Sequence, residues 1–188
     1  MSARNDIMTR PPTKLLVLDL DETLIHGSPE SVGGDFEAAG IPVFIRPGAQ
    51  SFLEQMATTF ELAVWTSASS DYAADIVNTL FPIPPQFLWC RERCVRWFNP
   101  ETCETEFVKD LKKLRRQGRN LAHVLVVDDS PEKLARSYGN LVRVPPFTGG
   151  PDDILPRLAA FLMQLASEPD VRRVEKRGWL ESGDSRRI

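Results

Sequence analysis

Acidic side chains occur in two short clusters that could act together on one ligand. Asp19 and Asp21 lie two residues apart, and Asp128 and Asp129 are adjacent. Four carboxylates at one place repel one another unless a cation neutralises them. The chain has only two histidines and three cysteines, which excludes a histidine-rich zinc site. Oxygen ligands without a nearby thiol or imidazole favour Mg²⁺, so these acids, if they meet, predict a magnesium site.

Four short apolar runs predict the strands that would bring these acids together. Their nearly continuous Leu and Val content is typical of a parallel sheet covered on both faces. Helical patterns lie between them, and strands alternating with helices predict right-handed crossovers. We therefore expect an α/β fold, a doubly wound and mostly parallel sheet with helices on both faces. The predicted strands are Leu15–Leu18, Leu62–Trp65, Val124–Val127 and Leu141–Val144, and the predicted helices are Gln50–Thr58, Asp71–Leu80, Phe107–Arg116 and Ile154–Leu165.

The residues that follow each strand are the candidate site residues, because ligands of such sheets bind beyond the carboxyl ends of the strands. The first strand leads into Asp19 and Asp21, the second into Thr66-Ser67 and the third into Asp128-Asp129. Three strands thus deliver carboxylates or hydroxyls to one rim. In the alternative, the first two acids only shape a turn and Asp129 only caps a helix. That alternative explains each acid separately but not their shared position.

The segment Asp-Leu-Asp-Glu-Thr-Leu at residues 19–24 resembles the first motif, Asp-x-Asp-x-Thr, of the haloacid dehalogenase superfamily of phosphotransferases. This form is typical of the phosphatases acting on the C-terminal domain of RNA polymerase II and of their small, NLI-interacting-factor-like relatives. The resemblance runs in order from residue 14 to about 166 and implies a haloacid dehalogenase-like, Rossmannoid fold. The further matching segments are Arg46-Pro47-Gly48, Trp65-Thr66-Ser67-Ala68, Arg91-Glu92-Arg93-Cys94, Val108-Lys109-Asp110-Leu111 and Val127-Asp128-Asp129-Ser130-Pro131.

The resemblance implies a magnesium-dependent phosphatase that hydrolyses phosphomonoesters through an aspartyl-phosphate. Asp19 would be the nucleophile, which splits hydrolysis into two easier steps. Asp21 would protonate the leaving oxygen and then deprotonate the attacking water. Thr66 would hydrogen-bond the phosphoryl group, and Lys109 would neutralise its growing charge.

The metal ligands are assigned by the same resemblance. The Asp19 carboxylate, the Asp21 backbone carbonyl and the Asp129 side chain would hold Mg²⁺. Asp128 would orient Lys109 or a metal-bound water, or serve as the alternative ligand.

Substrate binding would involve Ser67 and Arg91 beside Thr66 and Lys109. For the two basic residues the ordinary alternative is a solvated surface, since the segment 109–119 is rich in lysine and arginine. The Val-Lys-Asp-Leu match favours a site role for Lys109, and the position of Arg91 in the family suggests that it lies near the substrate phosphate.

The substrate class is suggested by the absence of room for a lid. The intervals between Leu24 and Arg46 and between Ser70 and Asp110 are too short for a large cap domain. A bulky substrate must then exclude water from the site, so we expect a phosphoprotein carrying phosphoserine or phosphothreonine. Two alternatives stay open: a phosphatase of small phosphate esters or nucleic-acid ends, and a non-catalytic binding module that keeps the fold, as in a presequence-receptor subunit of the mitochondrial import machinery. The presence of both acids of the first motif favours an enzyme.

The composition suggests a cytoplasmic protein. The 188 residues carry a net charge of −3, so no overall charge attracts nucleic acid. No apolar run reaches the ~18 residues of a membrane span. Three cysteines without a CxxC pair indicate free thiols in a reducing compartment.

The domain division follows from composition. We expect a disordered lead-in at 1–13, the phosphatase domain at 14–168, and a charged tail at 169–188 that is frayed or loosely docked, with Trp179 as an anchor. Within the domain, the turn signal Asn99-Pro100 predicts a hairpin between Arg93–Trp97 and Thr102–Val108.

Overall fold

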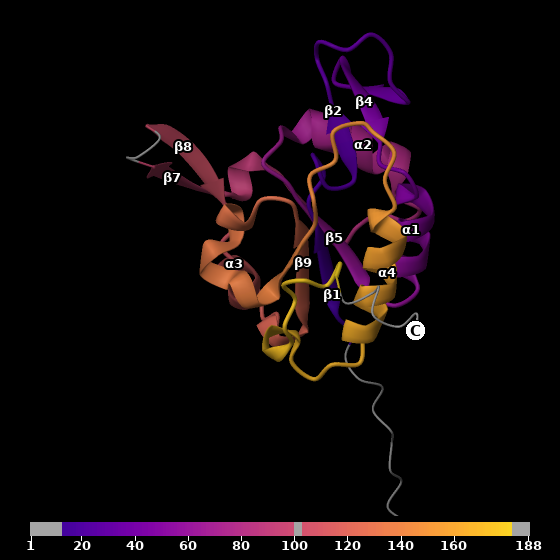
Figure 1. Cartoon of the computed structure of the whole chain (residues 1–188). Helices are drawn as coiled ribbons and strands as arrows, with labels where there is room; N and C mark the ends of the chain where they lie inside the picture. The colour runs from indigo at the N-terminus through magenta and orange to yellow at the C-terminus, as the bar shows by residue number, and fades with distance from the viewer. Residues whose placement is uncertain (1–12, 100–102, 182–188) are drawn as a thin grey trace, which may run out of the picture.

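A five-stranded parallel sheet forms the centre of the computed structural model, which describes residues 13–99 and 103–181 (Figure 1). The strand order is β10-β9-β1-β5-β6, so the expected doubly wound, parallel fold is confirmed. The four predicted strands are present, and β6 is an addition that is too short for its periodicity to be recognised. The bounds are Leu15–Leu18 for β1, Glu61–Trp65 for β5, Leu88–Trp89 for β6, Val124–Asp128 for β9 and Leu141–Arg143 for β10.

Helices cover both faces of this sheet (Figure 1). Successive strand residues point to opposite faces. Accordingly, Leu16 and Leu18 pack in one core with α1, α2 and α4, while Leu15 and Val17 pack in the other with α3 and η3. The helices are α1 (Ala49–Ala57), α2 (Ser70–Leu80), α3 (Lys112–Arg116) and α4 (Ile154–Leu165), with 3₁₀ segments η1 (Arg91–Arg93), η2 (Leu121–His123), η3 (Pro131–Asn140) and η4 (Val171–Arg173).

The predicted helix Phe107–Arg116 is wrong in its first half. Residues 104–108 form β8, which pairs antiparallel with β7 (Val95–Asn99) in a projecting hairpin (Figure 1). Val108 lies opposite Val95, and such cross-strand pairs stabilise strands. The helical part begins only at Lys112. The hairpin itself is confirmed with shifted bounds, although residues 100–102 of its predicted turn lie outside the described part.

The segment between β1 and α1 forms a small antiparallel sheet of order β2-β4-β3 rather than a lid domain. No large cap is present among the described residues. At Gly27 of β2, a Cβ atom would collide with the hydroxyl of Tyr72 on α2. The glycine therefore lets α2 approach the loop that follows β1. The strands are β2 (Ile25–Gly27), β3 (Phe36–Ala38) and β4 (Ile41–Ile45).

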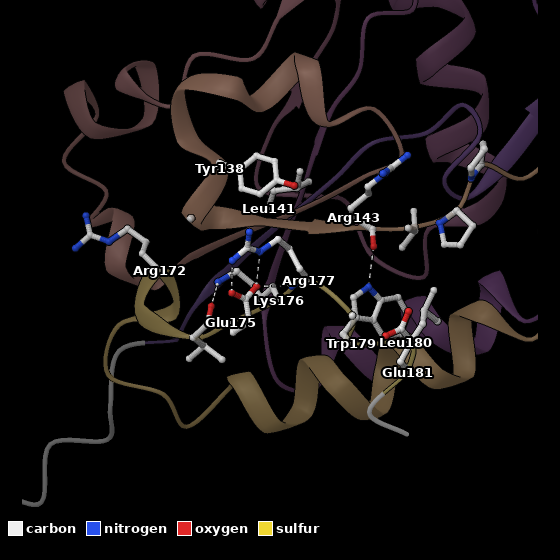
Figure 2. Close-up of a pocket in the computed structure, with 16 residues that line it drawn as sticks. Tyr138, Leu141, Arg143, Arg172, Glu175, Lys176, Arg177, Trp179, Leu180 and Glu181 are labelled. Carbon is white, nitrogen blue, oxygen red and sulfur yellow. Dashed lines mark hydrogen bonds and ion pairs between the residues drawn. The ribbon is translucent and has the colours of Figure 1, made fainter. Parts of the chain in front are cut away.

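The segment 169–181, expected to be either frayed or loosely docked, packs against the core (Figure 2). Val171 and Trp179 are buried. The Trp179 indole Nε1 donates to the carbonyl of Arg143 on β10 at 2.7 Å, and its ring stacks on Phe161 of α4. Burial of Val171 and Trp179 thus holds the segment on the core although most of its other residues are charged. Trp179 is the anchor that the sequence suggested. A cavity of about 810 Å³ lies between this segment and β10 (Figure 2).

Both ends of the chain lie outside the part that the structure describes. The lead-in predicted at residues 1–13 and the last part of the predicted tail, residues 182–188, lie outside the described residues, except for residue 13. Within the described part, no helix is long and apolar enough to cross a membrane.

Replacing the anchor should destabilise the whole fold. We expect Trp179→Ala to lower the free energy of unfolding by about 3 kcal/mol, because it removes a buried indole and leaves a cavity. Denaturant unfolding measures this change. Trp97→Ala, on the exposed face of β7, is the control and should cost less than about 0.5 kcal/mol. Equal losses in the two variants would contradict the docking of the segment.

Candidate active site

Asp19 is a buried carboxylate held directly after β1. Its amide donates to the carbonyl of Val127 on the neighbouring strand β9, at 3.0 Å. Its Oδ1 accepts the Leu20 amide at 2.9 Å, and its Oδ2 lies 3.0 Å from Lys109 Nζ and 3.3 Å from Lys133 Nζ. Burial opposes the charged form, but the two ammonium groups outweigh it and hold the pKa of Asp19 below its usual range. Asp19 is therefore an ionised carboxylate in a dry environment.

Lys109 is held between two carboxylates. The alternative that it is a solvated surface lysine is therefore wrong. The side chain is fully buried, and Nζ donates to Asp128 Oδ2 at 2.6 Å in addition to its contact with Asp19. The other oxygen of Asp128, Oδ1, accepts the Ser130 amide at 2.9 Å. Because both oxygens of Asp128 are engaged, this residue is placed to orient Lys109.

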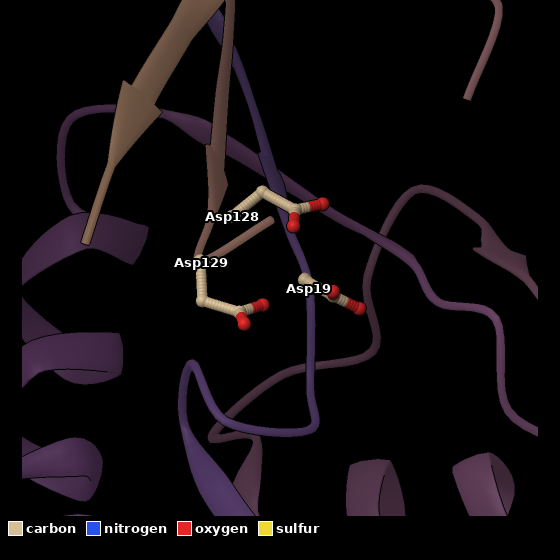
Figure 3. A group of neighbouring side chains, drawn as sticks. All are labelled: Asp19, Asp128 and Asp129. Carbon is tan, nitrogen blue, oxygen red and sulfur yellow. The ribbon is translucent and has the colours of Figure 1, made fainter. Parts of the chain in front are cut away.

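Asp129 carries the feature that best fits a metal ion. Its Oδ2 accepts the Ser130 hydroxyl at 3.0 Å, whereas Oδ1 is buried without a hydrogen-bond partner among the described residues. Carboxylate oxygens of Asp19, Asp128 and Asp129 lie within 4.8 Å of one another. Figure 3 shows Asp19 on one strand end and the other two on the neighbouring strand end. A buried, unpaired carboxylate oxygen is costly, and an all-oxygen donor set suits Mg²⁺.

Asp21 lies two residues after Asp19 and is held by a hydroxyl. The Tyr72 hydroxyl donates to Asp21 Oδ1 at 3.0 Å. Burial, and next the charge of Asp19, raise the pKa of Asp21 to about 6. Asp21 is thus the acid of this loop that binds a proton more readily, while Asp19 stays ionised.

The residues after β5 form the neighbouring side of the site, because β5 pairs directly with β1. Thr66 is fully buried, and its Oγ1 accepts the Ala68 amide at 3.1 Å. The Ser67 carbonyl accepts Arg91 Nε at 2.7 Å. Arg91 is exposed and lies over the Phe107 ring of the hairpin, so the structure places it on the rim and outside the carboxylate cluster.

Lys133 is the charged residue of the site that the sequence analysis missed. It approaches Asp19 from the start of η3, and its carbonyl accepts the Lys109 amide at 2.8 Å. The signal was present as the segment Asp-Asp-Ser-Pro-Glu-Lys at 128–133. Pro131 favours a helical turn at this point, and one turn returns residue 133 toward the strand end.

Arg46 ties the loop after β1 to two other segments. Arg46 is buried and donates to the carbonyl of Thr23 at 2.9 Å and to the carbonyl of Pro145 at 3.0 Å. Its guanidinium also forms an ion pair with Asp152 Oδ2 at 2.7 Å. The Thr23 hydroxyl, by contrast, is buried without a hydrogen-bond partner in the described part of the chain. The loop is therefore braced through its backbone by Arg46.

The comparison with known families agrees with this geometry. The family model described as NLI interacting factor-like phosphatase matches residues 14–172. The chain belongs to this family. The resemblance to the small phosphatases of the RNA polymerase II C-terminal domain is thereby confirmed.

Curated relatives and solved structures show how far the similarity extends. The chain is 34% identical over 172 residues to human carboxy-terminal domain RNA polymerase II polypeptide A small phosphatase 1, covering 85% of this chain and 62% of that protein. It is 34% identical over 170 residues to the mitochondrial import inner membrane translocase subunit TIM50 of Phytophthora infestans, covering 87% and 37%. An uncharacterised protein of Schizosaccharomyces pombe is 33% identical over 172 residues, covering 86% and 50%. The chain thus spans between 37% and 62% of the length of these three relatives.

The solved structure of Fcp1, an essential RNA polymerase II CTD phosphatase, has the same fold. It aligns with a TM-score of 0.53 and 20% identity over 92% of this chain and 53% of that chain. The fold class predicted from the sequence is confirmed by this likeness.

The brace at Arg46 can be tested through stability. We expect Arg46→Met to lower the free energy of unfolding by about 3 kcal/mol, because it leaves Asp152 and two carbonyls without their donor. Arg46→Lys should recover little of the stability lost in Arg46→Met, since a single ammonium cannot make the several hydrogen bonds of the guanidinium group. The control is Arg119→Met, which breaks a half-exposed pair with Glu61 and should cost less than about 1 kcal/mol. A similar loss in Arg46→Met and Arg119→Met, measured by denaturant unfolding, would rule out the brace.

Proposed function

We propose that this protein is a magnesium-dependent phosphatase that hydrolyses phosphomonoesters through an aspartyl-phosphate on Asp19. The observation that carries the proposal is the buried Asp19 carboxylate, which lies 3.0 Å from Lys109 Nζ and against two further carboxylates. A buried anion next to a fixed cation is suited to attack a phosphoryl group whose charge the cation then shares.

In the first step, a carboxylate oxygen of Asp19 attacks phosphorus and forms the P–O bond of the aspartyl-phosphate. The bond from phosphorus to the ester oxygen breaks at the same time. The leaving oxygen takes a proton from Asp21, whose raised pKa gives it a larger protonated fraction than an ordinary aspartate has. The products are the free alcohol and the phosphorylated enzyme.

In the second step, a water molecule gives its proton to the Asp21 carboxylate and attacks the phosphorus. The P–O bond to Asp19 breaks, so the Asp19 carboxylate is regenerated and inorganic phosphate leaves. Asp21 is again protonated, as at the start of the cycle. Tyr72 holds the Asp21 side chain in place through both steps.

The remaining residues bind the phosphoryl group and the metal. Lys109 balances the charge of the phosphoryl oxygens, and the Thr66 hydroxyl and the Ser67 backbone lie on the neighbouring strand end to contact them. The Asp19 carboxylate, the Asp21 carbonyl and Asp129 would hold Mg²⁺, and Asp128 orients Lys109. When bound, the metal neutralises charge on the nucleophile and the phosphate.

The proposed substrate is a phosphoprotein with phosphoserine or phosphothreonine. No large cap covers the strand ends in the described part, so a large substrate would itself exclude water. From the exposed rim, Arg91 would contact the protein around the phosphorylated residue. We further propose a cytoplasmic location, because the sequence has three cysteines without a CxxC pair, which suits a reducing compartment.

The alternative is a binding module without catalysis, since one relative is a translocase subunit. The observation that favours an enzyme is that Asp19, Lys109 and Asp129 converge at the ends of β1 and β9. The second acid of the first motif, Asp21, is also present.

Removing either acid of the first motif should abolish turnover without unfolding the protein. With an aryl phosphate and Mg²⁺, we expect Asp19→Asn to hydrolyse substrate no faster than buffer. Asp21→Asn should lose about 10²- to 10⁴-fold in rate, as for the loss of a general acid. Chelation of Mg²⁺ should stop the wild-type protein. Wild-type turnover that equals that of Asp19→Asn at saturating Mg²⁺ would refute the proposed catalysis.

A substrate panel tests the open site separately. We expect phosphoserine and phosphothreonine peptides to have a higher kcat/KM than sugar phosphates or nucleotide monophosphates. Of these substrates, only a peptide is long enough to cover the surface around the strand ends and exclude water from the site. Arg91→Ala should raise the KM for phosphopeptides and leave the KM for an aryl phosphate nearly unchanged. A preference for sugar phosphates over every peptide would contradict the phosphoprotein assignment.

A further inference from the structure

Two lysines share one oxygen of Asp19, but only one of them can leave. Lys109 is fully buried and has a second carboxylate partner, Asp128, at 2.6 Å. Lys133 lies 3.3 Å from Asp19 Oδ2, and its side chain is 22% exposed. The backbone of Lys133 is independently fixed, because its amide donates to Ser130 and its carbonyl accepts the Lys109 amide. A rotation of its side chain alone would therefore release Asp19.

The Lys133 ammonium lies against the candidate metal cluster. Its Nζ is 3.3 Å from Asp19 Oδ2, and carboxylate oxygens of Asp19, Asp128 and Asp129 lie within 4.8 Å of one another. The ammonium is therefore a counter-ion of this cluster. It does not satisfy the whole cluster, since Asp129 Oδ1 keeps no hydrogen-bond partner in the described part.

A divalent cation at this cluster needs the same carboxylate oxygens that Lys133 neutralises. Two positive groups cannot share them without strong repulsion at distances of a few ångströms. Lys109 cannot yield, because its movement would leave Asp128 buried and unpaired. Lys133 can yield, because its side chain is partly exposed and can rotate its ammonium into water.

We propose that Lys133 is a built-in competitor of the divalent metal: it binds the Asp19 carboxylate in the metal-free protein and moves into solvent when the metal binds. The inference rests on the proposed function only in taking these carboxylates as the metal site. In the metal-free protein, Lys133 would then reduce the repulsion between the carboxylates. It would also make the affinity for the metal lower than the carboxylates alone would give.

The experiment measures Mg²⁺ binding directly, by calorimetric titration of the full chain without substrate. We expect Lys133→Met to bind Mg²⁺ about tenfold more tightly than the wild type, because a neighbouring positive charge is removed. Lys133→Arg keeps the charge and should bind close to the wild type. Lys112→Met, at an exposed lysine of α3, is the matched control and should not change the affinity.

Thermal unfolding supplies a second readout that does not depend on calorimetric heats. In chelator, Lys133→Met should melt below the wild type, because the buried Asp19 has lost one counter-ion. Saturating Mg²⁺ should then raise its melting temperature by more than it raises that of the wild type. A smaller rise would overturn the proposal.

The titration also separates this proposal from the proposed function. Unchanged or weaker Mg²⁺ binding by Lys133→Met, with a wild type that binds Mg²⁺, overturns the competition and leaves the phosphatase proposal intact. Unchanged Mg²⁺ binding with weaker inhibition by inorganic phosphate would make Lys133 a phosphate ligand instead, which also overturns it. If neither the wild type nor Lys133→Met binds Mg²⁺, both proposals fail.

Discussion

The rest of the structure depends on keeping Asp19 ionised while it is buried. A carboxylate removed from water is costly unless a partner compensates it. Here Lys109 supplies the compensation and is itself locked by Asp128, so three side chains from separate segments form one buried charge network. In the proposed reaction, this burial strengthens the interaction of Asp19 with an incoming phosphoryl group.

The topology of the sheet explains why these segments meet. The chain proceeds from β1 outward to β5 and β6, then returns to place β9 on the other side of β1. The loops after β1 and β9 therefore diverge at a switch point, where open α/β sheets bind their ligands. Asp19 leaves one strand, Asp128 and Asp129 leave the other, and Lys109 is delivered by the hairpin that precedes β9.

Much of this arrangement could be predicted from the sequence, because buried parallel strands are continuous apolar runs and catalytic side chains follow their ends. Other parts depended on tertiary contacts that leave weak local patterns. Phe107 and Val108 are compatible with a helix until their partners on β7 are known. Trp179 stabilises a segment whose composition is that of a tail. Lys133 follows the Asp128-Asp129 pair closely in the sequence, but only the turn at Pro131 brings it to Asp19.

The central claim is that Asp19 accepts the phosphoryl group beside a metal held by Asp129. The most direct test is a crystal structure of the protein with Mg²⁺ and beryllofluoride, which mimics a phosphoryl group on a carboxylate. We expect beryllium bonded to an oxygen of Asp19, with Lys109 Nζ near the fluorides and Mg²⁺ in contact with Asp129 Oδ1. An adduct on another residue, or Mg²⁺ bound away from these carboxylates, would contradict it.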